Sequence, residues 1–483
     1  MSFNEETRLV HCYDDDDGYQ SVEQLKRQEV TSFEHELWYM TKTSIPLVFT
    51  FLLQNSLSTI ALIFAGRVGT LEVGGISIGN VTFAVTSAIF IGIATCLDTV
   101  CPQAFGAGNY QMVGLYFQRG VAISLMFAVP VVAFWYNSEY LLAFLVKDDD
   151  IVHIAAVYLR TMILSLPGYI LFECGKKYLQ AQGDYVTGQN ILFVCAPLNI
   201  LLNYLFVLKY KFGYIGSPIA IVLSYNIMGL AIFAVICRQN YFGNAQCWHP
   251  IKGNVSAIFS NWGPLVALAL PGLIMIEAEF FAFEIITVLS ARFGNDVLAA
   301  QSIVATLQTF FFQLPFSCSV ATSNRISHHI GSGNIKNCKI ATKATIFGVG
   351  SLAGVINFTS LFFGRYKLCS IFNTDPILVN KAARILTVIA MNQVYDVFNV
   401  VAAGVLRAQG RQRIGGYLNI VAYYIIGLET AMLLGFKCQM QIQGFWLGIG
   451  IGVLFLALSE NYYVYTSDWT SIVKRFKVMR QEA

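Results

Sequence analysis

Twelve apolar runs, each long enough to cross a lipid bilayer, dominate this chain of 483 residues. A hydrocarbon core about 30 Å thick needs about 20 apolar residues per helix. Hydrophobic residues make up 56% of the chain and charged residues 12%, which excludes an ordinary soluble protein. The sequence therefore predicts an all-α integral membrane protein. The predicted spans are residues 44–65, 73–97, 115–136, 151–173, 190–208, 215–236, 263–289, 297–321, 340–363, 382–404, 414–436 and 442–463.

The two halves of the chain carry matching residues at a nearly constant spacing. Pro46 matches Pro271, and Gly106-Ala-Gly-Asn109 matches Gly331-Ser-Gly-Asn334 at the same offset. We therefore expect two homologous six-helix bundles. Because six is even, both bundles enter the membrane in the same orientation and are related by a pseudo-two-fold axis along the membrane normal. Such parallel repeats are a transporter architecture.

Domain boundaries follow from this repeat and from the charge distribution. Residues 41–238 form the predicted N-terminal lobe, residues 263–466 the C-terminal lobe, and residues 239–262 the linker. Residues 1–40 hold ten acidic and three basic residues without apolar periodicity, which predicts a disordered acidic tail. Residues 467–483 form a basic tail. Cations are more frequent in the loops on the side of the two termini, so the positive-inside rule places both ends in the cytosol.

Acidic residues inside the apolar runs are the strongest functional candidates, because an ionisable group in hydrocarbon costs a few kcal/mol. The seventh predicted span holds Glu277, Glu279 and Glu284, the tenth holds Asp396, and the eleventh holds Glu429. With about 100° of rotation per residue, Glu277 and Glu284 share one helix face, whereas Glu279 and Glu284 diverge by about 140°.

The repeat makes the two lobes unlike in charge. Gln54 occupies the position that corresponds to Glu279, and Thr59 the position that corresponds to Glu284. A carboxyl group that is desolvated and close to other acids binds a proton more tightly. We therefore assign Glu279, Glu284 and Asp396 to the coupling of protons with a cationic substrate. The alternative is that each is a protonated carboxyl group that hydrogen-bonds between helices.

Other polar residues are weaker candidates. Asp98 and Gln103, near the inner end of the second span, are assigned a gating or structural role. Asn203 is an amide within a span that lines a cavity or hydrogen-bonds between helices. His328 and His329 are adjacent and have no third ligand nearby, so we expect a loop pair and no metal site. No Walker or HExxH motif is present in the sequence, and we predict that the protein is not an enzyme.

Several motifs resemble the multidrug and toxic compound extrusion (MATE) family, specifically its eukaryotic branch. Leu97-Asp-Thr-Val-Cys-Pro-Gln-Ala-Phe-Gly-Ala107 is similar to the family's loop after the second helix. Lys177-Tyr-Leu-Gln-Ala-Gln-Gly183, Ala300-Gln-Ser-Ile-Val304 and Gly404-Val-Leu-Arg407 resemble its other signatures. The similarity covers about residues 40 to 470.

This resemblance implies an antiporter that exports organic cations, xenobiotics or metabolites by alternating access, with protons or sodium as coupling ion and no other cofactor. Glu279-Phe-Phe-Ala-Phe-Glu284 matches the family's seventh-helix motif, and Asp396 matches its tenth-helix acid. Thr306 stands where animal members have a further Glu, and Glu429 stands at a common proline position. The residues that we expect to line the cavity are Gln54, Glu277, Thr306, Asn203 and Glu429.

Two other kinds of carrier are the alternatives. A major-facilitator carrier would also have twelve helices, but its basic loop after the second helix is absent, and Cys101-Pro-Gln-Ala-Phe-Gly106 stands there. A flippase for lipid-linked substrates would need a cationic cavity for phosphates, whereas the charge within the predicted spans is acidic. We expect a monomer in the vacuolar or plasma membrane that binds small organic cations and no nucleic acid.

Overall fold

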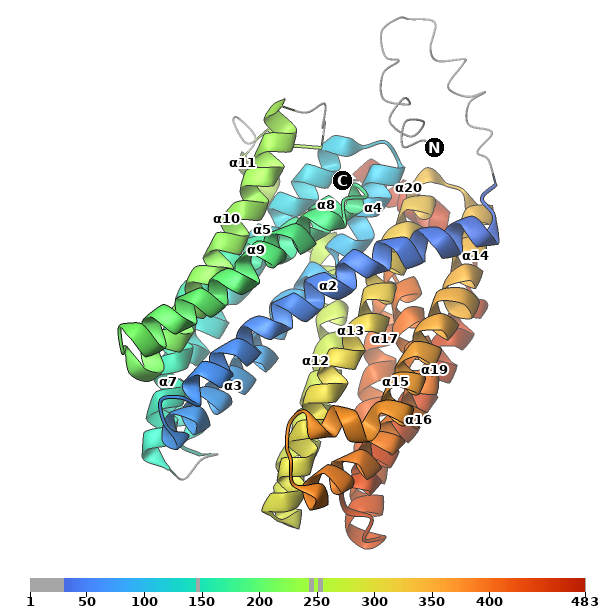
Figure 1. Ribbon diagram of the computed structural model, residues 1–483. Helices are drawn as coiled ribbons and strands as arrows, with labels where there is room; N and C mark the ends of the chain where they lie inside the picture. The colour runs from blue at the N-terminus through green and yellow to red at the C-terminus, as the bar shows by residue number, and fades with distance from the viewer. Residues whose placement is uncertain (1–29, 145–147, 243–246, 251–254, 483) are drawn as a thin grey trace, which may run out of the picture.

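The computed structural model describes residues 30–144, 148–242, 247–250 and 255–482. Within these residues, twelve helical segments are long and apolar enough to cross a membrane. They form two lobes that touch at the end of the molecule where the first described helix begins and the last one lies, and are apart at the other end (Figure 1). We call the first of these ends the terminal side. The prediction of an all-α membrane protein with twelve spans in two six-helix lobes is confirmed.

The N-terminal lobe contains the first six spans, and two of them consist of two consecutive helices. Its helices are α2 (Phe33–Ala65), α3 (Thr70–Ala94), α4 (Leu97–Gly106), α5 (Tyr110–Tyr136), α6 (Ser138–Leu142), α7 (Asp149–Met162), α8 (Leu166–Ala181), α9 (Val186–Asn203) and α10 (Gly216–Phe242). The short helix α11 (Val255–Phe259) lies in the predicted linker.

The C-terminal lobe repeats this arrangement, and π-helical segments join some of its consecutive helices. Its helices are α12 (Gly263–Ser290), α13 (Asn295–Ser332), α14 (Ile335–Lys343), α15 (Ser351–Ser370), α16 (Pro376–Ala408), α17 (Gln412–Ile420), α18 (Glu429–Met432) and α19 (Gln441–Tyr465), followed by α20 (Trp469–Glu482).

Local sequence signals explain where several helices start and stop. The Asp375 side chain accepts a hydrogen bond from the Ile377 amide at the start of α16, and Pro376 occupies the first helical position, where its missing N–H has no cost. Gly333, with a φ of 76°, ends α13 in the left-handed conformation that favours glycine. The helices are longer than the predicted spans because such caps lie in polar sequence beyond the apolar runs.

The lobes meet on the terminal side through α4, which packs against α13 and α16. Thr99 Oγ1 donates to the Arg407 carbonyl at 2.7 Å, and Gln103 Nε2 donates to the Ala408 carbonyl at 2.8 Å. A methyl group on Gly331 would overlap the Gln103 carbonyl, and one on its repeat partner Gly106 would overlap a carbonyl of α13. The matched glycines therefore let the two helix backbones touch.

Two segments that we predicted to be loops are helical. Residues 97–107 were expected to form a loop after the second span, but residues 97–106 form α4, whose residues Leu97 and Cys101 are buried. His328 and His329 lie within α13, and His329 is buried beside the Glu36 carboxylate. Both expectations were wrong because the polar and glycine-containing sequence is satisfied by contacts with the other lobe.

The structure also moves the boundaries of the predicted tails. Helix α2 begins at Phe33, because the Ser32 side chain caps it and Glu36 is fully buried. The remaining expectation of a disordered tail concerns residues 1–29, which lie outside the described residues. In the basic C-terminal tail, α20 is helical and buries Trp469 and Val473 in a cluster with α13 and α14.

We predict that Gly331→Ala destabilises the protein by about 1–3 kcal/mol, because the added methyl group has no space at the contact between α4 and α13. The matched control is Gly263→Ala, where a methyl group would meet no atom within 4 Å. Thermal unfolding of the purified protein in detergent measures both variants. Equal unfolding midpoints for the two variants would contradict the tight contact.

Candidate functional site

A cavity of about 270 Å³ lies between the two lobes. Both lobes contribute to its wall, which is rich in aromatic side chains. Pockets of this kind, apolar with a few polar groups, are typical of small-molecule sites. The aromatic residues in the wall are Phe51, Phe83, Tyr169 and Tyr225 from the N-terminal lobe and Phe280, Phe283, Phe312, Phe316 and Trp446 from the C-terminal lobe.

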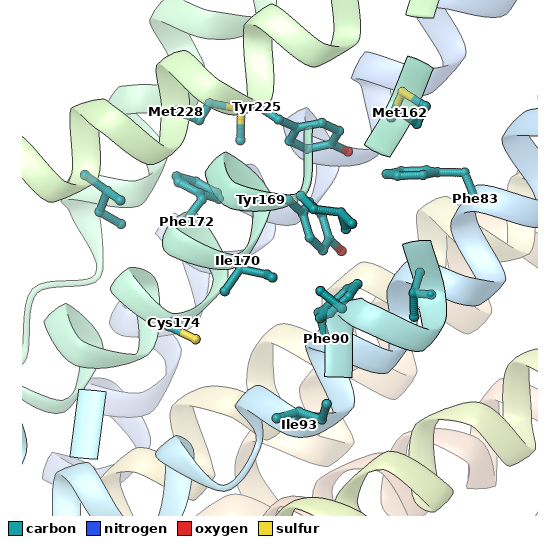
Figure 2. Packing of buried hydrophobic residues seen from close by; sticks show 14 of the residues in the cluster. Phe83, Phe90, Ile93, Met162, Tyr169, Ile170, Phe172, Cys174, Tyr225 and Met228 are labelled. Atoms are coloured by element: carbon teal, nitrogen blue, oxygen red, sulfur yellow. The ribbon is translucent and has the colours of Figure 1, made fainter. Parts of the chain in front are cut away.

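The aromatic part of the N-terminal wall is a packed cluster around Tyr169. Figure 2 shows Tyr169 between Phe90 and Tyr225, with Phe83 to one side. The rings of Tyr169 and Tyr225 are perpendicular, with centroids 5.1 Å apart, and those of Tyr169 and Phe83 are 6.2 Å apart. Each ring is held by its neighbours, so the cluster offers a rigid surface with electron-rich ring faces.

A buried ion pair neutralises the acid in the N-terminal wall. Glu173 lines the cavity, and its Oε1 accepts hydrogen bonds from Gln54 Nε2 at 2.8 Å and from Lys176 Nζ at 2.9 Å. Lys176 also donates to Gln54 Oε1 and lies 5.0 Å from the ring centroid of Phe51. Sequence reasoning missed Glu173 and Lys176, although an acid and a base three residues apart at the end of a predicted span were a visible signal.

In the C-terminal wall, Glu279 belongs to a group of acids. Among the described residues, no Lys or Arg forms an ion pair with these acids as Lys176 does with Glu173. Glu279 lines the cavity and is hydrogen-bonded to the Tyr423 side chain. Asp396 and Glu460 are close enough to Glu279 to interact with it electrostatically. Asp396 Oδ2 accepts a hydrogen bond from Gln393 Nε2 at 3.0 Å. The structure thus brings together Glu279 and Asp396, which we had selected, and Glu460, which we had not.

Arg407 is the cation nearest to this group of acids. It is buried and lines the cavity, and its guanidinium donates to Ser319 Oγ at 2.6 Å. Glu460 interacts with it electrostatically but forms no ion pair with it among the described residues. The charges that act on the Arg407 guanidinium are those of Glu460 and, from the other lobe, Asp98.

The structure places the other selected acids outside the wall. Glu284 is half-buried on α12 between the lining residues Phe283 and Thr287, but it is not itself a lining residue. Both carboxylate oxygens of Glu277 are buried and have no hydrogen-bond partner in the described structure. Glu429 is exposed among apolar residues of the lobe surface, so it does not line the cavity as we had expected.

Two further residues expected in the wall are also placed elsewhere. Asn203 is fully buried and joins helices of the N-terminal lobe through hydrogen bonds with Asn199 and Ser217. Thr306 is half-buried, and its hydroxyl donates to the Ser302 carbonyl of its own helix. Their side chains face neighbours that the sequence alone does not reveal.

Between the cavity and the terminal side, ion pairs and hydrogen bonds hold the helices together. Asp98, assigned a gating or structural role, pairs with Lys177 at 2.8 Å, and its carbonyl accepts a hydrogen bond from Ser327 Oγ in the other lobe at 3.2 Å. Gln103 lies in the same contact. Glu36 on α2 accepts two hydrogen bonds of 2.8 Å from Arg325 on α13. The Asp98–Lys177 pair lies within one lobe, whereas the bonds from Ser327 and Arg325 cross between the lobes and must break if a path opens from the cavity to this side.

A metal site is not visible in the described part of the chain, where no group of three His, Cys, Asp or Glu residues could hold an ion. The residues that line the cavity offer aromatic contact and the carboxyl groups of Glu173 and Glu279.

Comparisons with known proteins agree with this architecture. The family model MatE matches residues 46–205 and 271–433, one segment in each lobe. The chain therefore belongs to the MatE family and is a multi-pass membrane transporter. This membership rules out the major-facilitator alternative.

Two yeast relatives and one solved structure are especially similar. The uncharacterized transporter YDR338C of Saccharomyces cerevisiae is 36% identical over 97% of this chain, which spans 66% of that relative's length. The uncharacterized transporter C4B3.13 of Schizosaccharomyces pombe is 38% identical over 91% of this chain and 81% of its own length. The crystal structure of the eukaryotic MATE transporter AtDTX14 has a TM-score of 0.87 at 23% identity and covers 92% of this chain and 99% of its own. That likeness shows the fold.

We predict that Glu173→Gln costs about 3–5 kcal/mol of stability, because it leaves the Lys176 ammonium buried without its ion-pair partner. The double variant Glu173→Gln with Lys176→Met should be more stable than this single variant, since it removes both charges. Glu139→Gln is the control, because its ion pair with Arg160 is exposed and worth about 0–1 kcal/mol. Thermal unfolding in lipid nanodiscs measures the three proteins, and a double variant less stable than Glu173→Gln would contradict the interpretation.

Proposed function

We propose that the protein is a secondary active antiporter that exports small organic cations in exchange for protons by alternating access. The observation that carries the proposal is the position of Glu279, in the wall of an aromatic cavity between two lobes and beside Asp396 and Glu460. An organic cation and a proton would compete for the same carboxyl groups, which is the requirement for exchange.

The composition of the wall supports a cationic substrate. Ring faces attract cations, and the Glu279 carboxylate supplies the opposite charge. The Arg407 guanidinium in the wall interacts electrostatically with Glu460 and Asp98, and the Lys176 ammonium is bonded to Glu173. A phosphate group would therefore meet more acids than free cations, and the flippase alternative is disfavoured.

A pH gradient of one unit supplies about 1.36 kcal/mol per proton, which corresponds to a tenfold concentration ratio of a monovalent solute. In the proposed cycle, protons from the acidic side bind Glu279, Glu284 and Asp396 and release the substrate. Release of the protons on the other side restores the charge for the next substrate. Sodium is the competing choice of coupling ion.

We further propose that the terminal side faces the cytosol of a vacuolar or plasma membrane and that the protein acts as a monomer. The exposed cations Lys474, Arg475 and Lys477 on α20 support this orientation, because loops on the cytosolic side of membrane proteins are enriched in Lys and Arg. The contacts between α4 and α13 are then the closed inner gate, and Asp98 and Gln103 are part of it.

We expect Glu279→Gln, Glu284→Gln and Asp396→Asn each to reduce proton-driven transport at least tenfold while preserving folding. The amides keep the size of the side chains but do not exchange a proton. Tetraethylammonium uptake into proteoliposomes is measured with an imposed pH gradient, and separately with a sodium gradient. Glu429→Gln is the control, because Glu429 is exposed outside the cavity. Undiminished pH-driven uptake in the Glu279 and Asp396 variants would place coupling elsewhere, and uptake driven by sodium alone would replace the proton as coupling ion.

Alternating access predicts that a link between the lobes on the terminal side stops transport. Cysteines replacing Gln103 and Ala408, which are hydrogen-bonded across the lobes, are joined by a short thiol cross-linker in a background without the native cysteines. A link within one lobe, between cysteines at Glu139 and His153, is the control. Transport should stop only with the first link, and full turnover with that link in place would exclude the separation of the lobes there.

A further inference from the structure

Glu460 is a fully buried carboxylate whose two oxygens have no hydrogen-bond partner in the described structure. It lies on α19, and the next residue, Asn461, donates to the Phe398 carbonyl of α16 at 3.2 Å. A buried charge without a partner costs several kcal/mol. A carboxyl group held in this way is stable as the neutral acid or with a bound cation.

The packed elements around Glu460 supply four groups that titrate or carry charge. Glu279 lies on α12, Asp396 and Arg407 lie on α16, and Tyr423 lies in the π-helical segment that follows α17. Tyr423 interacts electrostatically with all three carboxylates and is hydrogen-bonded to Glu279. Insertions of π-helix within helices are frequent at functional sites, and here one places the phenol among the acids.

The three acids differ in their depth along the helices. Glu460 lies five residues before the terminal-side end of α19 at Tyr465, and Asp396 lies twelve residues before the same end of α16 at Ala408. At a rise of about 1.5 Å per residue, these positions are about 8 Å and about 18 Å from the helix ends, and Glu279 is about 24 Å from the start of α12. Glu460 therefore extends the group of acids from the cavity towards the terminal side.

We propose that Glu460 carries a proton of the transport cycle, receiving it from Asp396 and releasing it to the terminal side. In the transfer, the O–H bond of Asp396 breaks and an O–H bond of Glu460 forms, so one proton moves and no other reactant is needed. The inference rests on the proposed function and adds to it a fourth proton-carrying residue, which lies outside the cavity wall.

Arg407 links this step to the motion of the lobes. Its carbonyl accepts the hydrogen bond from Thr99 of the other lobe, and its guanidinium is bound to Ser319 rather than to Glu460. The guanidinium also interacts electrostatically with Asp98 of the other lobe. Separation of the lobes on the terminal side removes this interaction and leaves Glu460 as the acid with which the guanidinium interacts. Pairing favours the ionised carboxylate, so the proton leaves when that side opens.

The first test needs no substrate. Infrared difference spectra of the protein in lipid, recorded in H₂O and D₂O at neutral pH, report protonated carboxyl groups. Glu460→Gln should remove a carboxylic acid band that the control Glu429→Gln retains. Glu460→Leu, which replaces the unpartnered acid by an apolar side chain, should also fold and lack the band. A band unchanged in both Glu460 variants would overturn the proposal.

The second test separates coupling from substrate movement. In proteoliposomes with tetraethylammonium, Glu460→Gln should reduce pH-driven uptake at least tenfold. The same variant should retain the exchange of labelled for unlabelled tetraethylammonium without a gradient. Glu460→Asp should restore part of the pH-driven uptake. Equal pH-driven uptake in Glu460→Gln and the parent would refute the role of Glu460. If the parent protein shows no pH-driven uptake, the proposed function fails, while the infrared result still decides whether Glu460 holds a proton.

Discussion

Hydrocarbon offers no partner for a charge or for a backbone hydrogen-bonding group, and most features of this protein follow from that constraint. Backbone groups are satisfied within helices, which gives twelve spans. Charged side chains in those spans must pair, lose their charge or face a polar cavity. Lys176 pairs with Glu173 and Lys177 pairs with Asp98, whereas the acids around Glu279 have no ion-pair partner among the described residues. The group of acids around Glu279 is therefore where the protein retains a charge that a proton or a substrate can neutralise.

The contact between the lobes has the opposite character, because its groups satisfy one another. Gly106 and Gly331 let backbones approach, and the buried carboxylate of Glu36 accepts both hydrogen bonds from Arg325. Breaking this contact exposes carbonyls and charges that need water. It can open only where water reaches it, so opening on the terminal side and hydration of that side are one event. Most buried apolar residues pack within one lobe and need little repacking in such a motion, although Leu265 and Ala269 of α12 belong to the apolar cluster of the N-terminal lobe.

The sequence was sufficient for the spans, the repeat and the family, because hydropathy and matched residues are properties of the chain alone. It was sufficient to select Glu279 and Asp396, since acids in the middle of apolar runs are rare. It was not sufficient for Glu460, which lies at the polar end of a run and resembles a residue at the membrane surface until α16 is seen to cover it. Thr306 and Glu429 fall outside the wall because a helix sequence defines relative faces, whereas only the packing of neighbours decides which face meets the cavity. For the same reason, a segment containing Pro102 and Gly106 looked like a loop, although the other lobe stabilises it as α4.

The two halves show how a duplicated fold can carry different charges at matched positions of its two lobes. At matched positions, Gln54 in one lobe bonds an ion pair that is already neutral, and Glu279 in the other bonds a phenol beside two more acids. In the first lobe, the Lys176 ammonium already neutralises the Glu173 carboxylate. A proton that binds the second lobe changes the net charge of the cavity wall, which alters the affinity for a cation in the space between both lobes. In the proposed antiport, symmetry of shape thus supplies two rigid bodies that can rock, and asymmetry of charge decides which of them responds to the gradient.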